Sequence, residues 1–426
     1  MSAPPPDSIH PNYDLNRLTE EGADRQVGRC ELFVALAQGG MATVYLGRWI
    51  GAGGFEKTVA VKSLHRMYAS DPDFVSMFLD EARVVARIQH PNVMPIIDLV
   101  DDHGELFIVM EYVHGVTLAQ LTRQLRRDKR PMPIGIALRV ITGVLGGLHA
   151  AHEAKGAGGH NLDLIHRDVT PDNVMIGTDG YARLIDFGIA TALSGQPDDD
   201  ESIKGKPAYL APEQLLSLPL DRRTDVYSAA VVLWQALTGR KLVRGKNIGD
   251  VTMTVLAEER PPPSKYRKEV DTMLDEVVLR GMAMDMNHRY ASAEAMAEAL
   301  EDTQRVASHR EVGRFIAEVC ARRLSKMEEL KQAVEAAPVQ KRDSSEFRAP
   351  LSVHRAEVQF EVPRLSVVDD GSFSEVDLSV REAPPADAQP RDTLRPLPRF
   401  AFDGKVAAAI VILFLVLVAA AIATGC

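Results

Sequence analysis

The N-terminal half of the chain has strand-like patterns with a helix-like pattern between them. Residues 59–62, Val-Ala-Val-Lys, have the alternating character of a strand, and Leu106–Met110 is a short continuous apolar run. Both are predicted to be strands. Between them, residues 72–88 are predicted to form a helix, because apolar side chains recur there at helical spacing, at Phe74, Phe78, Val85 and Ile88.

Two further helices are predicted in the second half of the chain. The first runs from Asp225 through an apolar stretch to Leu237 and is ended by Gly239. The second covers residues 303–335, where apolar positions at helical spacing are separated by charges. Its apolar stripe is too irregular for heptads, so it suits either a capping helix packed on the preceding domain or a dimerisation helix.

The C-terminal segments have a different composition. Residues 336–404 are rich in proline, serine and charge, and cannot bury enough apolar surface to offset chain entropy, so a disordered linker is predicted. Residues 406–423 are uninterrupted apolar residues that span ~27 Å as a helix, so we expect a single transmembrane helix over 405–424. Basic residues precede it, which predicts a cytoplasmic location for everything N-terminal to it and a single-pass protein of the cell membrane.

Acidic and amide side chains with characteristic spacing lie in the middle of the chain. Asp168 is followed five residues later by Asn173, and Asp186-Phe187-Gly188 comes after that. Asp168 is suited to accept the proton of an attacking hydroxyl. Asn173 and Asp186 are oxygen ligands of the kind that Mg²⁺ prefers when it bridges ATP phosphates. The pattern therefore predicts phosphoryl transfer.

The order of these and other motifs resembles the protein kinase superfamily, and most closely the bacterial eukaryotic-like (Hanks-type) serine/threonine kinases. The resemblance covers residues 29–302 and includes the runs Gly39-Gly40-Met41 and Tyr209–Gln214. It implies an α+β fold of the bilobal kinase type. The small β-rich N-lobe would hold a five-stranded antiparallel sheet and one main helix, and the larger C-lobe would be α-helical. Residues 1–28 are expected to be a flexible leader.

The resemblance also implies the roles of individual residues. Lys62 would contact phosphates and pair with Glu81, Asp168 would be the catalytic base, and Asn173 and Asp186 would hold Mg²⁺. ATP would bind between the lobes against Ala60, the hinge residues Glu111 and Val113, and the glycine-rich loop, whose residues are Leu36, Ala37, Gln38, Gly39, Gly40, Met41, Ala42, Thr43 and Val44. Glu213 and Arg289 would form a buried structural ion pair.

The sequence departs from the family pattern beside the catalytic aspartate. Thr170 stands where the family has lysine, and Lys206 stands where it has threonine. In the family fold these two side chains approach each other. We therefore expect Lys206 to supply the positive charge of the missing lysine, and Thr170 to make the hydrogen bonds of the family's threonine hydroxyl. The site would then keep its charge. The opposite interpretation is that both positions drifted and catalysis weakened. Ala37 and Ala42 replace two usual glycines.

Composition limits the other functions. The net charge of −10, without a basic stripe, argues against broad nucleic-acid binding, and three widely spaced cysteines suit a reducing compartment. His149, His152 and His160 are expected to be solvated rather than metal ligands. The expected partners are protein substrates with Ser or Thr acceptors, and small residues in the membrane helix would permit self-association there. The alternatives are a membrane-tethered pseudokinase that binds nucleotide and a scaffold that acts through 303–404.

Overall fold

The computed structural model describes residues 22–69, 71–156, 158–187, 206–243, 248–256 and 260–339. These all belong to the first of the two units into which the chain divides, Met1–Glu346. Most of the predicted leader, almost all of the predicted linker 336–404 and the predicted membrane helix 405–424 lie outside the described residues. So do the side chains of Glu81 and Lys206.

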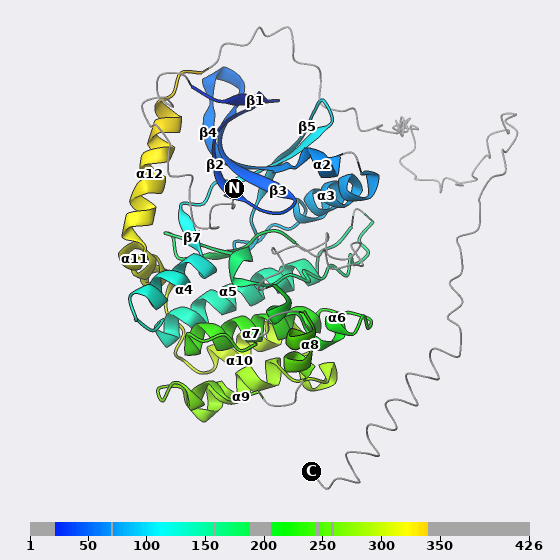
Figure 1. Cartoon of the computed structure of the whole chain (residues 1–426), viewed down its shortest axis with the longest axis vertical. Coiled ribbons are helices and arrows are strands. Elements are labelled where there is room, and N and C mark those ends of the chain that lie inside the picture. Colours follow the sequence, from blue (N-terminus) through cyan, green and yellow to red (C-terminus); the bar gives the residue numbers. More distant parts are fainter. Residues whose placement is uncertain are drawn as a thin grey trace, which may run out of the picture. The chain divides into compact units, whose positions relative to one another are not determined.

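The N-lobe is built on one antiparallel sheet with the strand order β1-β2-β3-β4-β6-β5 (Figure 1). Its strands are β1 (Arg25–Val27), β2 (Cys30–Gln38), β3 (Ala42–Ile50), β4 (Glu56–Leu64), β5 (Ile96–Asp102) and β6 (Glu105–Glu111). The sheet has six strands instead of the expected five. The additional strand is β1, which pairs with residues 30–32 of β2, so the structured domain begins inside the range 1–28 that was predicted to be a flexible leader.

Apolar residues of the central strands form the core of this lobe. Val59 and Val61 on β4 pack with Phe107 and Val109 on β6, and all four are at most 1% exposed. The alternation seen in the sequence therefore places one face of β4 in the core, whereas Lys62 follows on the face toward the cleft. A short turn η1 (Ala52–Gly54) joins β3 to β4.

The helix predicted over 72–88 is α3 (Pro72–Val85), preceded by the short α2 (Arg66–Ala69). It ends three residues earlier than expected because the chain tightens there: Arg87 and Ile88 donate to the carbonyls of Val84 and Val85. Phe78 on α3 packs against Leu64 and Ile108 of the sheet, so the predicted apolar stripe does face the core.

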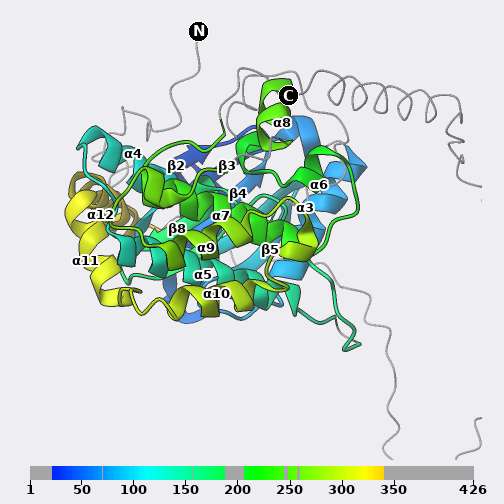
Figure 2. The same ribbon diagram turned by 90° about the horizontal axis from the view of Figure 1, so that it is seen from below.

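The C-lobe is helical around α5 and α7, both almost entirely buried. Figure 2 shows α10, α5, α7 and α9 lying side by side in this lobe. Its helices are α4 (Leu118–Arg127), α5 (Ile134–His152), α6 (Pro212–Leu215), α7 (Arg223–Thr238), α8 (Ile248–Leu256), α9 (Thr272–Gly281) and α10 (Ala293–Glu301), with short turns η5 (Lys206–Tyr209), η6 (Pro263–Lys265) and η7 (Met286–His288). Among the described residues, α5 has the length and hydropathy of a membrane span, but it is the central core helix.

Two helices follow the C-lobe where one was predicted over 303–335. They are α11 (His309–Val319) and α12 (Ala321–Ala336), and residues 303–308 are not helical. Ser308 caps α11 in a capping box with Glu311, and the backbone breaks at Cys320, where φ is −108° and ψ is 19°. Figure 1 shows α12 running from the C-lobe to the side of the N-lobe sheet.

Candidate active site

A small three-stranded sheet carries the catalytic segment. The strands are β7 (Gly115–Thr117), β8 (Val174–Gly177) and β9 (Ala182–Leu184), in the order β7-β8-β9. Asp168 and Asn173 precede β8, joined by the turn η2 (Pro171–Asn173). The amide of Asn173 donates to the backbone carbonyl and to Oδ2 of Asp168, both at 2.8 Å. One nitrogen therefore fixes the orientation of the carboxylate, and the amide oxygen of Asn173 is left for another ligand.

Asp225, at the first turn of α7, fixes the backbone of the catalytic segment. Its carboxylate accepts from the backbone N–H of His166 and of Arg167, and from Nε2 of His152, each at 2.8 Å. Burial acts to raise the pKa of Asp225, but the hydrogen bond and charge of His152 outweigh it, so the pKa lies below its ordinary value. The expectation that His152 is solvated was wrong, because its side chain is 1% exposed.

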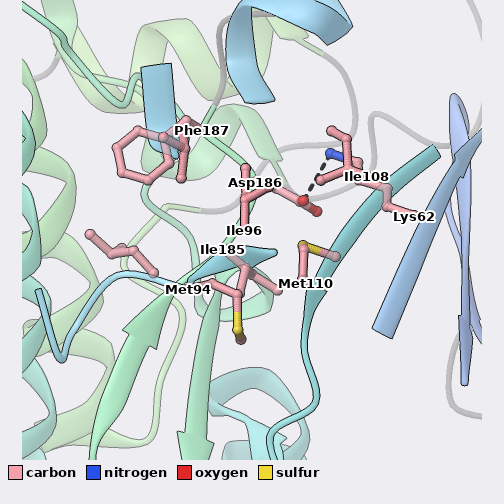
Figure 3. A pocket seen from close by; sticks show the side chains of 10 residues that line it. Lys62, Met94, Ile96, Ile108, Met110, Ile185, Asp186 and Phe187 are labelled. Atoms are coloured by element: carbon pink, nitrogen blue, oxygen red, sulfur yellow. Dashed lines mark hydrogen bonds and ion pairs between the residues drawn. The ribbon is translucent and has the colours of Figure 1, made fainter. Parts of the chain in front are cut away.

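Asp186 lies two residues after the end of β9 and faces Lys62 of β4. Nζ of Lys62 is 2.8 Å from Oδ1 of Asp186, and Figure 3 shows the two side chains pointing toward one another. Phe187 is turned into the core, with its ring 4.5 Å from that of His166 and a side chain that is 2% exposed. The segment around His166 and the segment of Asp186 and Phe187 are therefore packed together through these rings.

Two of these residues have left-handed backbone conformations. Arg167 has φ of 67° and Asp186 has φ of 53°. Each costs about 1–2 kcal/mol for a residue with a β-carbon, and such strain persists only where surrounding contacts impose it. Here the bond from Arg167 N–H to Asp225 is one such contact. Left-handed non-glycine residues also occur elsewhere among the described residues, for example at His103 and Ser217, but Arg167 and Asp186 are next to, or within, the predicted chemistry.

A small apolar cavity lies behind the Lys62–Asp186 pair. Its volume is about 20 Å³, room for about one water molecule. Figure 3 shows its lining, which includes Met94, Ile96, Ile108, Met110 and Phe187. Because Met110 directly precedes the hinge residue Glu111, this cavity is the inner end of the cleft between the lobes.

The glycine-rich segment forms the hairpin between β2 and β3. Gly39 N–H donates to the carbonyl of Ala42 at 2.8 Å, which closes the turn. Neither Ala37 nor Ala42 is among the described residues with positive φ, so the two alanines impose no backbone strain. A β-carbon built on Gly40 would meet no atom within 4 Å, so the space beside the turn is open to a ligand.

His65 attaches this hairpin to the end of β4. Its Nδ1 donates to the carbonyl of Gly40 at 3.1 Å, and its Nε2 lies 2.9 Å from Oγ1 of Thr43. Its backbone N–H also donates to the carbonyl of Met41. Sequence reasoning missed His65, since a single histidine after a strand carries no signal of this contact.

Thr170 and Lys206 were predicted to exchange the roles of the family's lysine and threonine, and the structure describes the side chain of Thr170 alone. Thr170 is 2% exposed, and its hydroxyl has no hydrogen-bond partner among the described atoms. The side chains of Lys206 and Glu81 lie outside the described residues, so neither the Thr170–Lys206 approach nor the Lys62–Glu81 pairing is tested.

The predicted ion pair between Glu213 and Arg289 forms. The guanidinium donates to both carboxylate oxygens, at 2.7 and 2.8 Å, and also to the backbone carbonyls of Ala283, Arg223 and Met284. Both side chains are at most 4% exposed. The pair connects α6 to the segment after α9 and has a structural role.

Residues 31–300 match the family model described as a protein kinase domain. The chain belongs to the protein kinase family. Tyrosine-protein kinase MasK of Myxococcus xanthus is 38% identical over 267 residues, which are 62% of this chain and 41% of MasK. Serine/threonine-protein kinase PrkC of Bacillus subtilis is 32% identical over 270 residues, 63% of this chain and 39% of PrkC.

The kinase fold is shared with solved structures. A crystal structure of the Mycobacterium tuberculosis PknI kinase domain is 28% identical, with a TM-score of 0.52, and the match covers 67% of this chain and 99% of that domain. MasK and PrkC are much longer than the region they share with this chain, which is about two fifths of each. The comparison therefore describes the kinase domain and not the remainder of those proteins.

Proposed function

We propose that this chain is an ATP- and Mg²⁺-dependent protein kinase that phosphorylates serine or threonine, including its own residues, at a membrane. The observation that carries the proposal is the cluster in which Lys62 meets Asp186 at 2.8 Å while Asn173 orients Asp168. A cation, a metal-ligating carboxylate and an oriented base are the parts that phosphoryl transfer requires.

The residues present fit a magnesium–nucleotide group. The oxygens of Asn173 and Asp186 suit Mg²⁺, and the open space at Gly40 admits phosphate close to the backbone. When bound, this group supplies the phosphoryl to be transferred and neutralises its charge. Lys62 would position phosphate oxygens, and the carboxylate of Asp168 would accept the hydroxyl proton while Asn173 holds that carboxylate in place.

Lys206 and Thr170 complete this proposal. The hydroxyl of Thr170 is buried and has no hydrogen-bond partner among the described atoms, so it can still donate and accept the hydrogen bonds that the predicted exchange of roles requires. Lys206 would then supply the positive charge beside the transferred phosphate. Replacing Lys206 with alanine should lower kcat, and the double exchange Thr170→Lys with Lys206→Thr should restore it. Unchanged turnover in Lys206→Ala would refute this assignment.

Membrane attachment is proposed from the sequence of residues 405–424. Full-length protein should sediment with membranes and resist extraction by alkaline carbonate. A variant with Leu413→Arg and Leu415→Arg should be released, because charges near the bilayer centre are costly. Release of the unaltered protein by carbonate would argue against a spanning helix.

The first test of function is phosphate transfer from labelled ATP with Mg²⁺ by full-length protein in detergent, next to Asp168→Asn. Loss of transfer in the variant, with nucleotide affinity retained, would support the kinase. Acid hydrolysis of the labelled protein distinguishes phosphoserine and phosphothreonine from phosphotyrosine, which the name of MasK makes a relevant outcome.

The second candidate is a nucleotide-binding pseudokinase at the membrane. The observation that favours it is the absence of the usual lysine at Thr170. The open turn at Gly40 and the unstrained backbone at Ala37 and Ala42 are compatible with nucleotide binding in either case. Nucleotide binding without any transfer by the unaltered protein would support this alternative.

A further inference from the structure

Helix α11 is attached to the C-lobe through two glycines. A β-carbon on Gly180, in the turn between β8 and β9, would lie 1.9 Å from the carbonyl oxygen of His309, and one on Gly313 would lie 2.3 Å from that of Thr178. The ring of His309 stacks on Tyr181 with centroids 3.9 Å apart. Only a residue without a side chain permits this approach, so the position of α11 on the C-lobe is closely defined.

Helix α12 continues from α11 but its apolar stripe is divided between two cores. Leu324, in its first turn, joins the main core of the C-lobe. The later members of the same stripe pack against Phe33, Val34 and Leu46 of the N-lobe sheet; they are Met327, Leu330, Ala333 and Val334, followed by Ala337 just beyond the helix. A single helix therefore connects the two lobes, as its course in Figure 1 shows.

Arg48 on β3 holds the C-terminal end of α12. Its NH1 donates to the carbonyls of Ala337 at 2.7 Å and Val334 at 3.2 Å, and its NH2 donates to that of Pro338 at 3.2 Å. The carbonyls at the end of a helix have no partner within the helix, so Arg48 caps α12 from the sheet. Glu31 pairs with the same guanidinium at 2.6 Å, and both side chains are at most 2% exposed.

The apolar cluster that α12 shares with the sheet extends to residues that are predicted to bind the nucleotide. Tyr112, between the hinge residues Glu111 and Val113, packs against the cluster formed by α12 and the sheet, and so does Leu36 at the start of the glycine-rich loop. Burial raises the pKa of Tyr112 to about 12, helped by the charges of Glu328 and Glu335 on α12. The cluster that α12 completes thus reaches the hinge and the start of the glycine-rich loop.

We propose that α12 is a positioning element for nucleotide binding: docked on the N-lobe by Arg48, it holds the hinge around Tyr112 and the relative orientation of the two lobes. The part of this proposal that is tested by KM and kcat rests on the proposed kinase function. Both helices lie beyond residues 31–300 that match the kinase domain, so α12 is an addition to the domain rather than one of its catalytic parts.

The physical consequence is an effect on nucleotide affinity more than on turnover. When α12 leaves the sheet, the lobes and hinge sample more orientations, and affinity falls by the fraction of molecules that keep the competent one. ATP at saturation selects the competent orientation again, so kcat is largely recovered. A loss of about fivefold in ATP affinity corresponds to a competent fraction of about one fifth.

Adjacent positions on α12 provide a matched pair of variants for the test. Ala333→Asp places a charge in the buried stripe, whereas Gln332→Asp places the same charge on the exposed face. In both cases a glutamate lies four residues earlier, Glu329 or Glu328. Gln332→Asp also removes the hydrogen bond from Gln332 to Glu328 at 3.1 Å, so the control disturbs the helix surface at least as much as the test variant does. In full-length protein we expect Ala333→Asp to raise the Kd and KM for ATP about fivefold or more with kcat within twofold, and Gln332→Asp to change neither.

A second variant removes the attachment of α12 without leaving a buried charge. Glu31→Leu with Arg48→Met deletes both members of the ion pair, which cores commonly tolerate, and leaves the carbonyls of 334, 337 and 338 without their donor. It should raise the Kd for ATP in the same direction as Ala333→Asp. It therefore decides the question even where Ala333→Asp does not fold.

Amide hydrogen exchange completes the experiment independently of catalysis. Exchange should accelerate at residues 111–114 and along α12 in Ala333→Asp or Glu31→Leu/Arg48→Met, relative to Gln332→Asp. Faster exchange in α12 with an unchanged hinge and unchanged ATP affinity would overturn the proposal, and so would α12 remaining protected in both disrupted variants. Absence of phosphate transfer by the unaltered protein would refute the kinase function but leave this comparison decisive.

Discussion

Replacing Asp225 with asparagine should destabilise the protein and slow catalysis through the backbone of residues 166–168. The carboxylate is fully buried and accepts three hydrogen bonds at 2.8 Å, from His152 and from the N–H groups of His166 and Arg167. Asparagine has one oxygen, so its NH₂ group must face at least one of these donors.

The magnitude follows from these contacts. An N–H left buried without an acceptor costs about 1–3 kcal/mol, and two bonds that lose their charged acceptor weaken by about 1 kcal/mol each, giving about 3–5 kcal/mol in total. The free energy of unfolding of a domain is typically about 5–15 kcal/mol, so the variant should fold with a clearly lower urea midpoint. Release of Arg167 from its strained conformation would displace Asp168, and kcat should fall roughly tenfold or more.

The measurement is urea unfolding together with kcat at saturating ATP. Asp275→Asn is the matched control, because Asp275 is also buried in the C-lobe but accepts from one described backbone N–H, that of Ser264. The control should lose about 1–2 kcal/mol and keep its kcat. A stability loss in Asp225→Asn no larger than in the control, or an unchanged kcat, would refute the reasoning.

Because the pKa of Asp225 is lowered, its stabilising contribution is present at neutral pH and disappears as the pH falls below about 4.

Three further predictions concern other contacts. Tyr112 has a pKa raised to about 12, so the folded state retains its proton and loses stability as the pH rises above about 10; Tyr112→Phe should remove this loss in unfolding measured at alkaline pH, and an identical pH profile would contradict it. His65→Ala should raise the KM for ATP severalfold by releasing the carbonyl of Gly40, checked by steady-state kinetics, and an unchanged KM would exclude this role. Glu213→Ala should lower the free energy of unfolding by about 3–5 kcal/mol, because Arg289 stays buried without its partner; a loss below 1 kcal/mol in urea unfolding would show that the backbone carbonyls suffice.

Local sequence patterns predicted the elements that carry the site. The alternating residues 59–62 form part of β4, the stripe beginning at Phe74 forms most of α3, and Gly239 ends α7 in a left-handed conformation. These predictions succeeded because periodicity and helix caps depend on neighbours in the chain. The ordered motifs around Asp168 and Asp186 identified the family for the same reason, since each motif is contiguous.

Contacts between distant segments could not be predicted in this way. Nothing near His152 in the sequence indicates that it will meet Asp225, 73 residues away, and the same holds for His65 and the turn at Gly40. Such contacts depend on how helices and strands pack, and a histidine in isolation is compatible with either solvent or the core. The expectation that His152 is solvated was wrong for this reason.

The sequence by itself determined that this chain holds a kinase domain, which residues could do its chemistry, and that an apolar segment follows near its C-terminus. Only the tertiary structure decided where residues 303–335 pack. An irregular apolar stripe shows that a helix is buried but not against what, because burial depends on the partner surface. Close approaches at Gly180 and Gly313 fix α11 on the C-lobe, and the apolar face of the N-lobe sheet together with Arg48 supplies the surface for α12, so this helix lies across both lobes.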